Sequence, residues 1–155
     1  MEVIIPRCAG LDVHKRIVVV CVRRLGPDGQ ISQEVRTFGT MTADLLSLAD
    51  WLVANGVTQV AMESTGVYWK PGSNLLETRS TVLVVNAQHI KQVPGRKTDV
   101  KDCRWIAQLL QHGPLRASFV PPRPIRQLRD LTRQRTQLIR HRATMAKRLQ
   151  KVLED

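Results

Sequence analysis

The sequence is poor in aromatic residues and cysteine, and each shortage excludes a class of protein. Only 4% of the 155 residues are aromatic, which argues against an RNA-binding sheet that stacks bases on aromatic side chains. The cysteines Cys8, Cys21 and Cys103 lack the close spacings of zinc and redox motifs. We therefore expect reduced, partly buried thiols in a cytosolic protein, and zinc is not expected.

Long hydrophobic runs are also missing. The apolar stretch after Met1 and Glu2 is too short for a signal peptide, and no segment approaches the length of a membrane span. We expect a soluble intracellular protein with no membrane partner. A length of 155 residues allows one domain with a core and a smaller appendage, but not two full domains.

Acidic residues are scarce relative to basic ones. The chain has 24 Lys and Arg against 13 Asp and Glu, a net charge of +11. From Pro114 onward there are 11 basic and 3 acidic residues, which leaves 13 basic and 10 acidic residues in the first 113. The excess charge indicates a polyanion such as nucleic acid as the partner, and the C-terminal part carries most of it.

The hydrophobic patterns predict an α/β domain followed by a long helix. The expected strands are Ala9–Val13, Ile17–Arg24, Gln30–Phe38, Val57–Met62 and Thr81–Val85, of which the first three form an antiparallel meander. Helices are expected at Thr42–Asn55 and, with Thr98 as the cap, at Asp99 to His112. The segment after Ser64 is expected to be a short helix or irregular structure interrupted at Pro71 and Gly72. Asn86 to Lys97 is expected to be a surface loop.

A stiff linker, Pro121–Pro124, precedes a stretch without Gly or Pro that predicts one helix of about 48 Å. Its 3,4-spaced positions form a seam with six apolar members, Leu128, Leu131, Leu138, Met145, Leu149 and Val152, interrupted by Arg135 and Arg142. The seam is explained equally well by a coiled-coil dimer and by docking onto the chain's own domain.

Four acidic residues fall where strands end or a helix begins. Asp12 and Glu63 end predicted strands, whereas Asp99 and Asp102 lie three residues apart in the first turn of a helix. Taken singly, each is explained by a turn, a solvated side chain or a helix start. Together they predict a site at one edge of the sheet for two divalent cations, Mg²⁺ or Mn²⁺, which bind oxygen ligands.

Basic residues surround the two late aspartates and continue along the long helix. We expect the nucleic-acid backbone to contact Lys91, Arg96, Lys97 and Lys101 near the acids and Arg126, Arg133 and Arg140 on the helix. Neutralisation of local negative charge is the alternative role for the first group.

Three segments contain the four acids: Gly10-Leu11-Asp12-Val13-His14-Lys15, Met62-Glu63-Ser64-Thr65-Gly66-Val67-Tyr68 and Gly95-Arg96-Lys97-Thr98-Asp99-Val100-Lys101-Asp102. These segments resemble the DEDD insertion-sequence transposases, the insertion-sequence one-ten family with its Piv-like invertases. The likeness spans nearly the whole chain, and the Thr-Asp-x-Lys-Asp element is its most specific part.

This resemblance implies an RNase H-like fold of the RuvC type, with a mixed sheet and flanking helices in residues 1–120. The DEDD tetrad, carried over as Asp12, Glu63, Asp99 and Asp102, is implied to bind divalent metal and to be catalytic. Residues 121–155 are implied to be a basic linker and a dimerisation helix, the start of a family coiled coil. The implied partners are DNA in transposition, a second copy of the chain and an element-encoded guide RNA, in the nucleoid of a prokaryotic cytoplasm.

Family members continue into a further domain with a nucleophilic serine, which this sequence does not contain. We therefore expect an N-terminal transposase domain that does not complete recombination by itself. The alternatives are a stand-alone RuvC-like junction resolvase, which would cut four-way junctions, and a non-catalytic basic binding and dimerisation module, which would not need metal.

Overall fold

A computed structural model describes residues 2–64, 66–86, 88, 90, 102–113 and 115–154. The chain divides into two compact units, Met1–Phe119 and Val120–Asp155. The first contains a sheet with helices on both faces, and the second contains one long helix.

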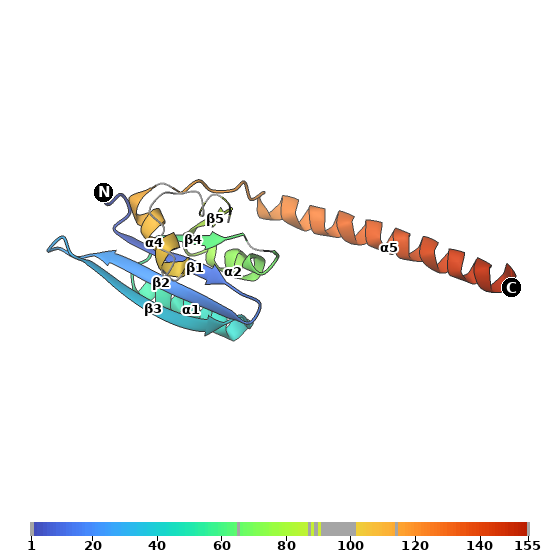
Figure 1. Ribbon diagram of the computed structural model, residues 1–155, viewed down its shortest axis with the longest axis horizontal. Helices are drawn as coiled ribbons and strands as arrows, with labels where there is room; N and C mark the ends of the chain where they lie inside the picture. Colours follow the sequence, from blue (N-terminus) through green and yellow to red (C-terminus); the bar gives the residue numbers. More distant parts are fainter. Residues whose placement is uncertain are drawn as a thin grey trace. The chain divides into compact units, whose positions relative to one another are not determined.

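A mixed five-stranded sheet forms the centre of the first unit (Figure 1). Its order is β3-β2-β1-β4-β5. The strands are β1 (Arg7–Val13), β2 (Ile17–Leu25), β3 (Ile31–Gly39), β4 (Gln59–Glu63) and β5 (Thr81–Val85). β1, β2 and β3 pair in antiparallel fashion, whereas β4 lies parallel to both β1 and β5.

The connections explain this order. Two hairpins join the antiparallel strands, and the second turns at Gly29, whose φ of 76° suits glycine. The parallel strands need longer crossovers, which contain the helices α1 (Thr42–Ala54) and α2 (Trp69–Leu76). The sheet therefore switches from antiparallel to parallel pairing at β1, which is its central strand.

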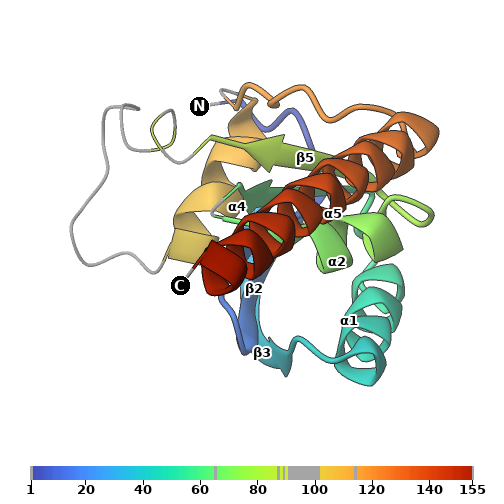
Figure 2. The same ribbon diagram turned by 90° about the vertical axis from the view of Figure 1, so that its right-hand side faces the viewer.

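Helices cover both faces of the sheet (Figure 2). Helix α4 (Asp102–His112) packs Ile106 and Leu110 against Cys8 and Ala61 on one face. Helices α1 and α2 lie on the other face. The apolar residues Ile106, Ala107, Leu109 and Leu110 of α4 are buried.

Helix α2 corrects one expectation. It runs through Pro71 and Gly72 without interruption. Pro71 is the third residue of the helix, where a backbone N–H has no acceptor within the helix, so its missing hydrogen costs no helical hydrogen bond. The proline is therefore compatible with the first helical turn.

The prediction of a surface loop from Asn86 to Lys97 is wrong for the described residues at its start, Asn86, Gln88 and Ile90. The Asn86 side chain accepts a hydrogen bond from the Gln88 backbone at 2.9 Å, and Ile90 N donates to the Asn86 carbonyl at 3.2 Å. Ile90 is buried in the core beneath α4. Residues 91–97, like the predicted helix start at Asp99, lie outside the described residues.

The second unit contains α5 (Arg123–Glu154), a helix of 32 residues. It begins inside the predicted linker, because Arg123 and Pro124 already belong to its first turn, a position that proline tolerates. None of the described residues of α5 is buried. No helix in the described ranges has the length and apolar character needed to cross a bilayer.

The predicted fold class is confirmed by these elements. The sheet is mixed, helices flank it, and a long helix follows at the C-terminal end. The three cysteines differ from the prediction in being fully rather than partly buried.

Candidate functional site

Asp12 and Glu63 lie side by side at the carboxyl ends of neighbouring parallel strands. The register pairs Leu11 with Met62, so the next residue on each strand is one of the two acids. Leu11 and Met62 are fully buried on the sheet face opposite α4. Because successive side chains on a strand alternate, Asp12 and Glu63 belong to the face that α4 covers.

Helix α4 brings Asp102 to the same place. It crosses β1 at Gly10, where an added Cβ would come within 2.9 Å of Ala107 Cα and nearer still to Ala107 N and the Cys103 carbonyl. The Cys8 thiol also donates to the Ala107 carbonyl at 3.5 Å. Since Gly10 precedes Asp12 by two residues, this close packing fixes the start of α4, and therefore Asp102, beside Asp12.

The pKa of Asp12 reflects the closeness of the other two acids, Glu63 and Asp102. The pKa of Asp12 is raised above its ordinary value of 3.8, first because burial disfavours the carboxylate and then because the negative charges of Asp102 and Glu63 lie near it. The charge of His14 and its hydrogen bond lower the pKa and offset part of this effect. Three acids that are remote in the sequence therefore share one electrostatic environment.

His14 holds the carboxylate of Asp12. Its Nε2 lies 3.0 Å from Asp12 Oδ2, and the imidazole is exposed. Sequence reasoning missed this contact. The signal was the spacing of two residues at a strand end, which places both side chains on one face of the sheet.

The fourth predicted acid, Asp99, lies outside the described residues. Within the described ranges, no group of three His, Cys, Asp or Glu side chains is placed to hold a metal ion together. Asp12, Glu63 and Asp102 nevertheless offer carboxylate oxygens, which are the ligands that Mg²⁺ and Mn²⁺ prefer. Burial and the neighbouring charges of Asp102 and Glu63 raise the pKa of Asp12, and a bound cation would relieve both effects.

The predicted nucleic-acid contacts divide into two groups. Lys91, Arg96, Lys97 and Lys101 lie outside the described residues. Arg133 and Arg140 are exposed on α5, whereas Arg126 is partly buried and donates to the Pro121 carbonyl at 2.9 Å. These three arginines are seven residues apart, so they lie along one stripe of the helix.

The predicted seam on α5 is open to solvent. Its six apolar members are all exposed: Leu128, Leu131, Leu138, Met145, Leu149 and Val152. Arg126, Arg133 and Arg140 occupy the heptad position opposite this seam. One stripe of α5 is therefore apolar and the opposite stripe is basic.

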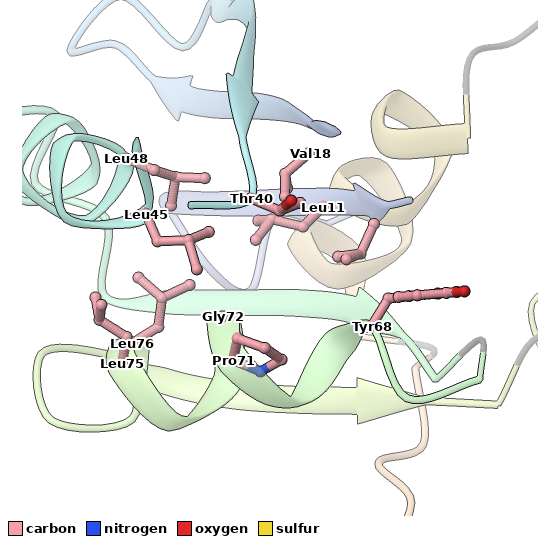
Figure 3. A pocket seen from close by; sticks show the side chains of 11 residues that line it. Leu11, Val18, Thr40, Leu45, Leu48, Tyr68, Pro71, Gly72, Leu75 and Leu76 are labelled. Carbon is pink, nitrogen blue, oxygen red and sulfur yellow. The ribbon is translucent and has the colours of Figure 1, made fainter. Parts of the chain in front are cut away.

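A small apolar pocket lies elsewhere in the first unit (Figure 3). It is lined by side chains of the sheet, α1 and α2, including Leu11, Leu45, Leu76 and Tyr68. Leu11 alternates with Asp12 on β1, so the pocket and the carboxylates belong to opposite faces of the sheet. The pocket is therefore separate from the acidic site.

A family model described as a transposase, that of the DEDD transposases of the IS110 type, matches residues 9–155. No curated protein matches the chain.

Among solved structures, the chain is similar to T. thermophilus RuvC in complex with a Holliday junction substrate, at 13% identity and a TM-score of 0.49. That match covers 72% of this chain and 99% of the RuvC chain. A second Thermus thermophilus RuvC structure matches over the same shares at 13% identity and a TM-score of 0.47. The fowlpox virus Holliday junction resolvase matches at 13% identity and a TM-score of 0.41, covering 52% of this chain and 60% of that one.

Proposed function

Because the chain belongs to the DEDD transposase family, we propose that its first unit is the RuvC-like metal-binding domain of a transposase acting on DNA. In this proposal Asp12, Glu63 and Asp102 hold Mg²⁺ or Mn²⁺ and are catalytic. Asp99 is the fourth ligand by family resemblance. The main support is geometric: the strand register puts Asp12 and Glu63 on neighbouring strand ends, and the close contact of α4 with Gly10 brings Asp102 beside Asp12.

The site offers the groups that phosphodiester chemistry needs. When bound, divalent cations activate the attacking oxygen and stabilise the leaving oxygen. The carboxylates supply the ligands, and the rigid contact of α4 with β1 keeps Asp102 in line with the strand ends. His14 orients the Asp12 carboxylate through one oxygen, which leaves the other oxygen available for coordination.

The second unit, Val120–Asp155, is proposed to bind the partners of the chain. The exposed apolar seam of α5 binds a second copy of the chain, because six solvent-exposed apolar residues at coiled-coil spacing are unfavourable in water. The opposite stripe, with Arg133 and Arg140, faces DNA or an element-encoded guide RNA. The chain acts in the cytoplasm, where its substrate DNA lies.

Calorimetric titration with Mn²⁺ tests the metal site. We expect saturable binding by the chain and at least about tenfold weaker binding by Asp12→Asn, Glu63→Gln and Asp102→Asn, since each removes one charged ligand. Asp50→Asn is a matched control, because Asp50 is an exposed acid of α1 that pairs with Arg79. Absence of saturable binding, or equal affinity in all four variants, would refute the proposal.

A further inference from the structure

The turn between β1 and β2 carries two cations next to the acidic site. β1 ends at Val13 and β2 begins at Ile17. His14 N donates to the Ile17 carbonyl at 2.9 Å, which closes the turn and places Lys15 and Arg16 at its tip. The tip therefore follows Asp12 by only three and four residues.

Neighbouring elements hold this tip in place. Thr40, the residue that follows β3, donates a hydrogen bond from its hydroxyl to the Lys15 carbonyl at 3.0 Å. The base of the turn is held by the pairing of Val13 with Val18 and by the contact of His14 with Asp12. Since the backbone is already ordered, binding through these side chains loses less conformational freedom than binding through a flexible loop.

The charges of Lys15 and Arg16 are available to a ligand. Both residues are exposed, and no ion pair joins either to another residue in the described part of the chain. If their role were to neutralise Asp12, they would contact its carboxylate, but His14 makes that contact. Two cations at a fixed tip beside an acidic site fit a polyanion that passes that site.

We propose that Lys15 and Arg16 bind the phosphate backbone of DNA next to the phosphodiester held at the carboxylates. This assignment rests on the proposed function and adds a substrate-positioning contact to it. Lysine supplies a compact charge, and the planar arginine guanidinium donates two parallel hydrogen bonds to phosphate oxygens. Neither residue reads base edges here, so the contact is independent of base sequence.

Fluorescence anisotropy with labelled DNA duplexes of three unrelated sequences, at several salt concentrations and in chelator, tests the contact. We expect Lys15→Gln and Arg16→Gln each to lower the slope of log affinity against log salt by about 1, and the double variant by about 2. The loss should be equal for the three sequences. Lys15→Arg keeps the charge and should retain wild-type binding.

Arg7→Gln is the matched control, because Arg7 is an exposed cation at the opposite end of the same strand. It should leave the salt slope unchanged. Wild-type slope and affinity in the double variant would overturn the proposal, as would a loss confined to an RNA duplex of the same sequence.

Mn²⁺ titration of the double variant separates the two proposals. Normal Mn²⁺ binding together with weaker DNA binding supports both the metal site and the turn. Normal Mn²⁺ binding with unchanged DNA binding refutes the DNA contact proposed for Lys15 and Arg16 and leaves the metal site unaffected. If the wild-type chain binds no Mn²⁺ while the turn variants still lose DNA affinity, the metal proposal fails and the DNA contact is supported.

Discussion

Gly10 of β1 and Ala107 of α4 lie so close that no side chain fits between their backbones. A Cβ on Gly10 would come within 2.9 Å of Ala107 Cα, and backbone atoms cannot rotate away as a side chain can. This contact determines how closely α4 approaches the sheet. It therefore also determines where Asp102 lies relative to Asp12.

Gly10→Ala is expected to destabilise the chain by about 1–3 kcal/mol, because the added methyl group must push α4 away from β1. Mn²⁺ affinity should fall with it, since Asp102 moves with the helix. Urea unfolding and Mn²⁺ calorimetry measure the two effects.

Gly72→Ala controls for the substitution itself. A Cβ on Gly72 meets no heavy atom within 4 Å, and alanine favours a helix over glycine. We therefore expect unchanged or slightly higher stability. Equal stability of the Gly10 and Gly72 variants would contradict the close approach of α4.

Asp12 is expected to make the metal-free fold less stable at neutral pH. Its pKa is higher in the folded state, so the folded chain binds that proton more tightly than the unfolded chain does. The resulting stabilisation is present below the ordinary value of 3.8 and is lost as the pH rises through the raised pKa.

Asp12→Asn should therefore be more stable than wild type at pH 7 in chelator, and equally stable at low pH. Because the Asp12 side chain is partly exposed, at 21%, solvent weakens the effect and we expect only about 0.5 kcal/mol. Urea unfolding at both pH values measures the difference. Saturating Mn²⁺ should stabilise wild type more than the variant, which reverses the order at pH 7. If the variant is less stable than wild type in chelator at pH 7, the ionised Asp12 carboxylate does not destabilise the fold.

Leu138→Glu is expected to disrupt a dimer formed through α5. Leu138 is exposed at a central position of the seam, and a charge buried there would weaken association by about tenfold or more. Sedimentation equilibrium measures the change. Gln137→Glu introduces the same charge at the adjacent position outside the seam and should leave association unchanged. A wild-type chain that remains monomeric at high concentration would refute the dimer.

The three thiols are expected to resist modification in the folded chain. Cys8, Cys21 and Cys103 are fully buried, and burial raises the pKa of Cys8 to about 12 and that of Cys103 to about 11. Because the thiolate is the reactive form, a thiol reagent at pH 7.5 should label the chain only as fast as it unfolds. Rapid labelling under native conditions, measured by mass spectrometry, would place a thiol at the surface.

Local patterns in the sequence were sufficient to predict most secondary structure. The β-rich runs of β1 and β2 and the 3,4 spacing in α1 and α5 arise from neighbours along the chain, so they are visible without the fold. These patterns gave wrong predictions where the structure depends on the position of a residue within a helix or on tertiary packing. Pro71 fits the first turn of α2, and Ile90 is buried because α4 covers it, although the surrounding residues are polar.

The sequence by itself determined the identities of the four candidate acids and the excess of positive charge. Only the tertiary structure decided that Asp12, Glu63 and Asp102 share one environment, that His14 holds Asp12 and that Lys15 and Arg16 lie at a fixed tip beside them. The physical reason is that strand register and the close contact at Gly10 join residues distant along the chain. The hydrophobic pattern of a single segment cannot predict such contacts, because they depend on residues elsewhere in the chain.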